Sequence, residues 1–269
     1  MKPHIIALDL DGTLLTDDKK ISIRNKTVIS KLRELGHKVV IATGRPYRAS
    51  KVYYQELLLD SPMVNFNGAF THHPTNPTIF ESEHTPIDQK TAKAIIETCE
   101  AFRVQNIMVE IIDEYYLRYR DKGFEDTFTL GQTPIDYGNL HTLLQEDPTS
   151  LLIYPEDNNH KALKDMLHSA HAEVIEQRSW GAPFNVIEIV KSGLSKAVGL
   201  KRISDFYQIP KDRIIAFGDE DNDLEMLEYV GCGVAMGNAI DELKAIANEK
   251  TVTNEEDGIA VFLEDRFHL

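Results

Sequence analysis

Short apolar runs alternate with amphipathic stretches in the N-terminal part of the chain. Residues 5–8 are wholly apolar, residues 22–35 carry apolar side chains at helical spacing up to Gly36, and after Lys38 the segment 38–42 is apolar again. Runs of this length are typical of buried strands, and the stretch between them is typical of a helix with one apolar face. A strand, a helix and a strand in this order predict two parallel strands joined by a crossover helix.

The pattern changes in the middle of the chain and returns near its C-terminal end. After a helix that begins near Pro46, a third strand is predicted at residues 63–66. The middle segment predicts helices and strands in mixed order, with a hairpin around Asp113-Glu114. Its predicted helices are residues 90–101 and 161–171, and its predicted strands are residues 107–112, 115–119, 151–154 and 186–190. After Lys191 the predicted elements are helix 195–207, strand 214–217, helix 224–229 and strand 233–235.

These elements predict the α/β fold class with an insertion. A Rossmann-like core with a parallel sheet is expected from residues 1–85 and 191–269, and an α+β domain is expected to be inserted at residues 86–190. The Pro/Thr-rich residues 74–77 are typical of a hairpin loop because strand-like residues flank them closely.

Composition and charge narrow the class of protein. The chain has 269 residues, a formal net charge of −14, 42% hydrophobic residues and 27% charged residues, which is typical of a globular protein. Nucleic acid and anionic membranes are unfavourable partners, because both are bound through Lys and Arg. Cys99 and Cys232 show no metal-ligand spacing, so we expect no disulfide framework. No apolar run approaches the roughly 20 residues that span a bilayer, and we expect a cytoplasmic protein.

The first candidate site is Asp9-Leu10-Asp11-Gly12-Thr13, directly after the first predicted strand. Ligands of open α/β sheets bind beyond the carboxyl ends of the strands, where these carboxylates are expected. Gly12 gives the turn its conformational freedom. The alternative is a solvated Asp-Gly turn without a function.

The second candidate site is the acidic run at residues 218–223, which follows the predicted strand 214–217 and so belongs to the same sheet edge. Carboxylates gathered after a buried strand favour a hard cation. An acidic helix start remains the alternative. A calcium-binding EF-hand loop is excluded, because Leu224 and Val230 occupy the positions of its required Gly and Glu.

Two weaker signals lie at helix starts. Thr43, Gly44 and Arg45 join a strand to a helix, where a hydroxyl and backbone N–H groups can bind phosphate, although capping alone explains Thr and Gly there. Lys196 lies at the start of a predicted helix, which is unfavourable for a cation unless it faces an anion. A solvent-exposed lysine is the alternative.

Together these segments resemble the motifs of the haloacid dehalogenase-like phosphatase superfamily, and within it the Cof-type (class IIB) sugar-phosphate phosphatases. The motifs are D-x-D-G-T-L at residues 9–14, the threonine of A-T-G-R at Thr43, the lysine of an S-K pair at Lys196 and G-D-x-x-N-D at residues 218–223. The resemblance extends over essentially the whole chain. The insertion lies where this subclass carries its cap domain, of the C2B type. Leu194 and Ile259 stand where the family motifs more often have Val. Neither difference affects the role expected of any site residue.

The resemblance implies a Mg²⁺-dependent phosphatase acting on small phosphorylated metabolites, with sugar phosphates expected first. Asp9 would be the nucleophile that forms an aspartyl-phosphate, and Asp11 would be the general acid and base. The implied Mg²⁺ ligands are the carboxylate of Asp9, the backbone carbonyl of Asp11 and Asp219.

The resemblance also implies phosphate-binding and supporting residues. Thr43 and Lys196 would hold the phosphoryl oxygens, and Asn222 and Asp223 would orient the metal waters and Lys196. The further candidates for substrate contact in the core are Gly44, Arg45, Asn67 and Asn222. The candidates for substrate contact in the cap or next to it are His84, Arg178, Trp180 and Asn185. For Trp180, packing in the core is the stronger expectation.

Two other functions remain open at this point. A phosphotransferase or mutase would use the same aspartyl-phosphate but return the group to a hydroxyl. A catalytically inactive metal- or ligand-binding module is disfavoured by the full set of motif residues. Glycine spacing for dinucleotides and a P-loop are absent from the sequence. The expected partner is a small phosphorylated metabolite, and the expected state is a monomer or a weak homodimer.

Overall fold

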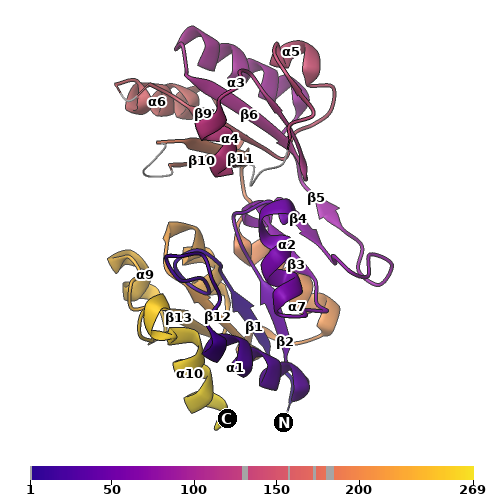
Figure 1. Ribbon diagram of the computed structural model, residues 1–269, viewed down its shortest axis with the longest axis vertical. Coiled ribbons are helices and arrows are strands. Elements are labelled where there is room, and N and C mark those ends of the chain that lie inside the picture. The colour runs from indigo at the N-terminus through magenta and orange to yellow at the C-terminus, as the bar shows by residue number, and fades with distance from the viewer. Residues whose placement is uncertain (1, 129–132, 157, 172–173, 180–184) are drawn as a thin grey trace. The chain divides into compact units, whose positions relative to one another are not determined.

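The computed structural model describes residues 2–128, 133–156, 158–171, 174–179 and 185–269, with the backbone alone at 176–179. Two compact units make up the chain. The first contains residues 1–45, 50–83 and 195–269, and the second contains residues 46–49 and 84–194. Each unit is described by itself below (Figure 1).

A five-stranded parallel sheet forms the centre of the first unit. Its order is β14-β13-β12-β1-β2. The strands are β1 (Ile5–Leu8), β2 (Lys38–Ile41), β12 (Ile214–Gly218), β13 (Cys232–Ala235) and β14 (Glu249–Lys250). All four residues of β1 are buried, as expected of a central strand whose two faces are both covered.

The helices of this unit are α1 (Ile23–Glu34), α2 (Tyr47–Glu56), α7 (Lys196–Tyr207), α8 (Leu224–Tyr229), α9 (Asp241–Ile246) and α10 (Gly258–Phe267). Ser22 caps α1 by accepting a hydrogen bond from the backbone N–H of Asn25. Helix α1 packs against α10, and α7 packs against α8. A small sheet, β3 (Met63–Asn65), β4 (Phe70–His72) and β5 (Glu83–His84), follows α2.

The strand order places a topological switch point at the centre of this sheet. From β1 the chain crosses to β2 on one side, whereas from β12 it crosses to β13 on the other side. Because crossovers are right-handed, the two connecting helices lie on opposite faces of the sheet. The segments that leave β1 and β12 therefore diverge, and ligands of α/β proteins bind at such a divergence.

Among its described residues, the second unit contains a six-stranded sheet, four helices and the start of α2. The strand order is β10-β11-β9-β6-β7-β8. The strands are β6 (Asn106–Ile111), β7 (Glu114–Leu117), β8 (Asp136–Tyr137), β9 (Ser150–Tyr154), β10 (Ile175–Ser179) and β11 (Ile187–Lys191). The helices are α3 (Gln89–Ala101), α4 (Lys122–Phe128), α5 (Leu140–Leu143) and α6 (His160–His171). Apolar residues of α3, α6, β6, β9 and β11 pack into one core cluster.

The start of α2 is grouped with this second unit. The buried guanidinium of Arg48 pairs with the buried carboxylate of Glu110, whose other oxygen accepts a hydrogen bond from Ser150 Oγ at 2.5 Å. The backbone N–H of Arg48 donates to Asp113 at 2.7 Å. Buried charges are tolerated when they are paired in this way. No pattern in the sequence indicated this attachment.

The predicted α/β class and the parallel central sheet are confirmed. The predicted hairpin is confirmed as well, since Ile111 and Glu114 pair across a two-residue turn. The strands β8, β10 and β14, the helices α4, α5, α9 and α10 and the division within α2 were missed. The domain boundaries at residues 86 and 190 stay a prediction. Both cysteines are free, and every described helix is too short or too polar to cross a membrane.

Candidate active site

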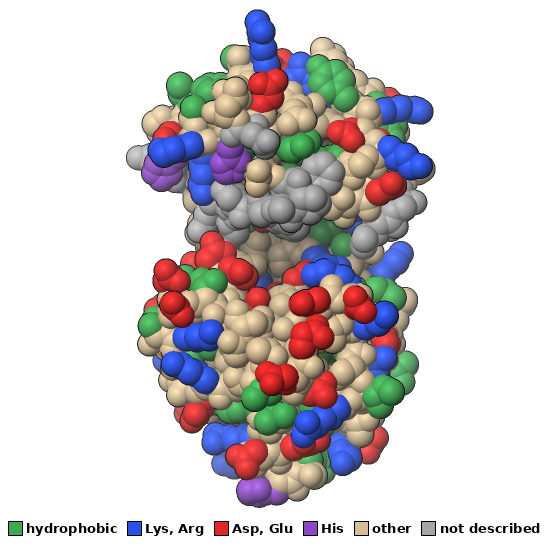
Figure 2. All heavy atoms as spheres, turned by 60° about the vertical axis from the view of Figure 1, so that its left-hand side comes forward, with side chains coloured by type: hydrophobic (Ala, Val, Ile, Leu, Met, Phe, Trp, Pro, Cys, Tyr) green, Lys and Arg blue, Asp and Glu red, His purple; other side chains and the backbone are tan. Residues whose placement is uncertain are grey.

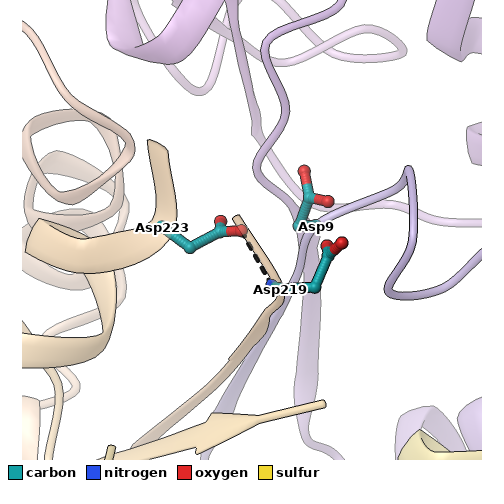
Figure 3. Close-up of side chains that lie close together, drawn as sticks. All are labelled: Asp9, Asp219 and Asp223. Carbon is teal, nitrogen blue, oxygen red and sulfur yellow. Dashed lines mark hydrogen bonds between the residues drawn. The ribbon is translucent and has the colours of Figure 1, made fainter. Parts of the chain in front are cut away.

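Three carboxylates meet where β1 and β12 end. Asp9 follows β1, Asp219 follows β12, and Asp223 ends the short helical turn after it. One carboxylate oxygen from each of the three lies within 4.8 Å of the others, and all three residues are buried. Figure 3 shows the carboxylates of Asp9 and Asp219 side by side, whereas that of Asp223 turns toward the backbone N–H of Asp219. The switch point of the sheet therefore brings together two motifs that are about two hundred residues apart in the chain.

The turn after β1 is shaped by its contact with Asp219. Thr13 is buried, and its hydroxyl donates to Asp219 Oδ1 at 2.7 Å. Gly12 has a φ of +70°, and a Cβ at this position would collide with the Asp219 carboxylate. Only glycine combines this left-handed backbone with such a close approach. Asn238 also binds the turn, donating from Nδ2 to the Gly12 carbonyl at 2.8 Å.

Lys196 is the cation of this cluster. Its side chain is fully buried, and Nζ donates to Asp9 Oδ1 at 2.7 Å and to Asp223 Oδ1 at 2.8 Å. Burial by itself would lower the pKa of the ammonium, but the carboxylates of Asp223 and Asp9 outweigh it and raise the pKa. The expectation that Lys196 faces an anion rather than solvent agrees with these contacts.

The cluster carries more negative than positive charge. Burial raises the pKa of Asp9, with Asp223 and Asp219 acting in the same direction and Lys196 opposing them. Burial likewise raises the pKa of Asp219 to about 7, against the hydrogen bond from Thr13. Three buried carboxylates next to one ammonium form a site in which an added cation is favourable.

The donor set fits a hard divalent cation. Carboxylate oxygens are the ligands that Mg²⁺ prefers. Oδ2 of Asp9 and Oδ2 of Asp219 receive no hydrogen bond from the residues that the structure describes, whereas both oxygens of Asp223 accept hydrogen bonds from Lys196 and from backbone N–H groups. Asp9 and Asp219 thus offer ligand atoms, and Asp223 holds Lys196 in place. The carbonyl of Asp11 as a third ligand stays a prediction.

Asp11 has a different environment from Asp9, although it is only two residues away. Its carboxylate accepts hydrogen bonds from Arg45 Nε and Nη2, each at 2.6 Å, and from Lys19 Nζ at 2.8 Å. Burial would raise the pKa of Asp11, but the hydrogen bonds and charges of Arg45 and Lys19 lower it to about 2. The carboxyl group in this arrangement is ionised, and both of its oxygens accept hydrogen bonds.

The remaining predicted residues form a connected group beside the cluster. Thr43 is buried, and its Oγ1 accepts a hydrogen bond from the Arg45 backbone N–H at 3.1 Å. The hydroxyl therefore also has a local backbone partner, as the capping alternative requires. Asn222 Nδ2 donates to Asn67 Oδ1 at 3.0 Å, and a Cβ at Gly44 would lie 3.1 Å from the Asn67 amide. The structure therefore brings Thr43, Gly44, Arg45, Asn67 and Asn222 together, and their contacts with substrate stay predictions.

The predicted cap residues have other surroundings. The imidazole of His84 hydrogen bonds to Thr149 Oγ1 at 2.8 Å, and Asn185 is exposed. Trp180 and the side chain of Arg178 lie outside the described residues. Sequence reasoning missed Lys19 and Tyr53, because a lysine in a polar turn and a tyrosine on an amphipathic helix carry no specific signal.

Comparison with known proteins identifies the family. The chain matches the model of the haloacid dehalogenase-like hydrolases over residues 6–263. It is 52% identical over 268 residues to the 5-amino-6-(5-phospho-D-ribitylamino)uracil phosphatase YitU of Bacillus subtilis, with 100% of this chain and 99% of that protein covered. It is 30% identical over 273 residues to the pyridoxal phosphate phosphatase YbhA of Escherichia coli, with 98% of both covered. The chain belongs to the haloacid dehalogenase-like hydrolase family and, as the motifs predicted, is a phosphatase.

Solved structures agree with this assignment at the level of the fold. TM0651 from Thermotoga maritima aligns with a TM-score of 0.85 and 27% identity over 98% of this chain and 97% of that one. The subclass IIB sugar phosphatase BT4131 aligns with a TM-score of 0.82 and 21% identity over 98% and 99% of the two chains. An inserted α+β unit in an α/β core is therefore the shared architecture.

Proposed function

We propose that this protein hydrolyses phosphate monoesters of small metabolites with Mg²⁺ as cofactor and Asp9 as nucleophile. The observation that carries the proposal is the position of the Asp9 carboxylate, between the Lys196 ammonium and Asp219 at the switch point of the sheet. A phosphate dianion approaching a carboxylate is repelled, so the site needs positive charge to bind it. Lys196 supplies one such charge, and the excess of buried carboxylates supports a second, from a metal ion.

Asp9 and Asp219 would hold the Mg²⁺ ion, with the carbonyl of Asp11 as the third protein ligand. A bound Mg²⁺ offsets the negative charge of the phosphoryl group and of Asp9. Asp223 would keep Lys196 directed at Asp9, because it accepts a hydrogen bond from the same ammonium. Lys196 and Thr43 would bind the phosphoryl oxygens that are not transferred.

Hydrolysis would proceed in two displacements at phosphorus. In the first, an Asp9 oxygen attacks phosphorus, the bond to the leaving oxygen breaks, and the leaving oxygen takes a proton from Asp11, which has to take up a proton from solvent before this step. The second displacement begins with a water molecule attacking the aspartyl-phosphate while Asp11 takes a proton from that water. The bond between phosphorus and Asp9 then breaks, inorganic phosphate leaves, and both carboxyl groups return to their starting states.

The names of two relatives support a substrate class. The relative at 52% identity is named for the phosphate ester of a ribitylaminouracil, and the relative at 30% identity is named for pyridoxal phosphate. Both compounds are phosphate monoesters in which the phosphorylated carbon belongs to a side chain of a nitrogen-containing ring. We expect the first of these esters to be the better substrate of the two, because the relative named for it is 52% identical to this chain and the other is 30% identical.

A phosphate-release screen tests the proposal. The panel contains 5-amino-6-(5-phospho-D-ribitylamino)uracil, pyridoxal phosphate, flavin mononucleotide and hexose phosphates, each with Mg²⁺ and with a chelator in its place. We expect release that depends on Mg²⁺ and that falls by on the order of 10⁴-fold in kcat in Asp9→Asn. The exposed Asp18 gives the matched control, Asp18→Asn.

The result that overturns the nucleophile assignment is wild-type phosphate release by Asp9→Asn. A phosphotransferase or mutase is distinguished by its need for an acceptor. If turnover requires an added sugar and stops in water alone, hydrolysis is not the reaction.

A further inference from the structure

Two cations bind the same carboxylate, and both of them contact a single tyrosine. Arg45 and Lys19 hold the two oxygens of Asp11. Arg45 follows β2, whereas Lys19 lies in the polar turn before α1. Tyr53 of α2 contacts each of these cations, and neither the motifs nor the mechanism above assigns it a role.

The hydroxyl of Tyr53 fixes the turn that carries Lys19. It donates to the Lys19 backbone carbonyl at 3.1 Å. Lys19 has a φ of +59° and donates its backbone N–H to the Thr16 carbonyl at 2.8 Å, so the turn is tight and left-handed at this residue. The side chain of Lys19 is about half exposed. A long, exposed side chain samples many rotamers, and the backbone anchor limits where its ammonium can lie.

The ring of Tyr53 supports the second cation. The guanidinium of Arg45 lies over the ring with 5.6 Å between Cζ and the ring centroid. Tyr53 itself is buried, so its position is set by packing rather than by these polar contacts. It is therefore a rigid support for two charged side chains.

We propose that Tyr53 is a positioning residue for Asp11, acting through Lys19 and Arg45, in the step that hydrolyses the aspartyl-phosphate. This inference rests on the proposed function. Both oxygens of Asp11 accept hydrogen bonds from these two cations, so the contacts that Tyr53 supports fix the orientation of this carboxylate. The base is needed when water attacks, so the effect of Tyr53 falls on the second displacement.

The variant Tyr53→Phe tests this role, because it keeps the ring and removes the hydroxyl. Tyr54→Phe is the matched control: Tyr54 is the next residue of the same helix, is buried, and donates its hydroxyl to the Ser61 carbonyl at 2.8 Å. The substrate is p-nitrophenyl phosphate, whose leaving group needs no proton. For this substrate kcat/KM reports the phosphorylation of Asp9. Where a burst of p-nitrophenol shows that the second step is the slower one, the steady rate reports dephosphorylation, and a single-turnover measurement gives that rate otherwise.

We expect the steady rate of Tyr53→Phe to fall roughly 3- to 10-fold, as the loss of one hydrogen bond of ordinary strength predicts. Its kcat/KM stays within about twofold of wild type, because positioning Asp11 does not assist that step. Tyr54→Phe changes neither quantity beyond its effect on the folded fraction. The inference is overturned if the steady rate of Tyr53→Phe equals that of Tyr54→Phe, or if its kcat/KM falls as far as its steady rate.

Lys19→Gln gives an independent test if Tyr53→Phe does not fold. It removes one of the two cations at a half-exposed position, and the same selective loss of the steady rate is expected. The double variant is expected to lose less than the product of the two single losses, because both act through one contact. A wild-type protein that releases no phosphate overturns the proposed function. A wild type that hydrolyses the ester while both single variants match it overturns only the role of Tyr53.

Discussion

Asp9 and Asp11 are separated by one residue and have opposite electrostatic environments. Asp9 is one of three buried carboxylates, and the single ammonium of the cluster, that of Lys196, binds Asp9 and Asp223. Burial raises the pKa of Asp9. Asp11 is half exposed and has two cations to itself, and its pKa is lowered to about 2. The first site has one cation for three carboxylates and therefore suits a metal ion. The second site has two cations for one carboxylate and needs no further positive charge.

The comparison of Asp9 with Asp11 shows which part of the net charge of −14 affects binding at the site. Figure 2 shows Asp and Glu side chains spread over the surface and interspersed with Lys and Arg. Exposed charges of this kind are screened by water and salt. The few carboxylates buried at the ends of β1 and β12 interact much more strongly, so a small part of the total charge determines what the site can bind.

Among changes to the groups around Asp9 and Asp11, the largest expected effect is that of removing the ammonium from the Asp9 cluster. In Lys196→Met the carboxylates of Asp9 and Asp223 lose their buried partner, so we expect a loss in kcat on the order of 10³-fold. The free energy of unfolding is expected to fall by about 3 kcal/mol or more, as when one partner of a buried pair is removed. Steady-state kinetics and urea unfolding measure the two effects.

The matched control is Lys201→Met, on the same helix. Lys201 forms an exposed pair with Asp205 at 2.6 Å. Exposed pairs contribute little, so this variant is expected to keep its activity and stability. Equal losses in the two variants would show that Lys196 acts only as part of the helix.

A smaller effect is expected when a carboxylate of the cluster is neutralised. In Asp219→Asn one charged ligand is lost, and we expect kcat/KM at fixed Mg²⁺ to fall on the order of 10²-fold, with part of the loss recovered at higher Mg²⁺. Activity is measured as a function of Mg²⁺ concentration. Asp221→Asn is the control, since Asp221 is exposed and lies outside the cluster. A Mg²⁺ dependence that is unchanged in Asp219→Asn contradicts its role as a ligand.

Gly12→Ala tests the contact between the two strand ends. The added Cβ meets the Asp219 carboxylate in a backbone with a φ of +70°. Gly36→Ala is the control for strain alone, because Gly36 has a φ of +88° and no neighbour within 4 Å of the added Cβ. Both variants are expected to lose about 1–2 kcal/mol of stability. Only Gly12→Ala is expected to lose activity, roughly 10-fold, through displacement of Asp219. Equal activity in both variants would contradict this account.

The smallest effect expected is on the pH dependence of stability. The pKa of Asp219 rises from 3.8 to about 7 on folding, mainly because of burial. Between these values the metal-free folded protein binds more protons than the unfolded chain, so its stability falls as pH rises. A metal ion binds the ionised carboxylate, and we expect Mg²⁺ to raise Tm by on the order of 3 °C more at pH 8 than at pH 5.5.

Thermal unfolding at the two pH values, with and without Mg²⁺, measures this difference. The variant Asp219→Asn, which lacks this titrating carboxylate but keeps Asp9, is expected to show a smaller difference between the two values. A rise in Tm that is equally large at pH 5.5 in the wild type would contradict the link between Asp219 and the metal.

Most of the first unit could be predicted because its signals are local. The apolar run at 5–8 and the stretch at 22–35 correspond to β1 and to α1 with its Ser22 cap. The short elements of the second unit, α4, β8 and α5, were missed because a few residues carry too little periodicity to separate a helix or strand from a loop. Arg48 was missed for another reason: its partner Glu110 is 62 residues away.

The sequence by itself determined the fold class and the edge of the sheet at which the acidic motifs lie. Hydrophobic periodicity and the position of Asp9 and Asp219 after apolar runs are properties of neighbouring residues, so they can be recognised along the chain. Only the tertiary structure decided which cation meets which carboxylate. Lys196 and Asp9 are 187 residues apart, and Arg45 and Asp11 are 34 apart. Charge interactions depend on distance in space and on burial, and the packing of the folded chain sets both.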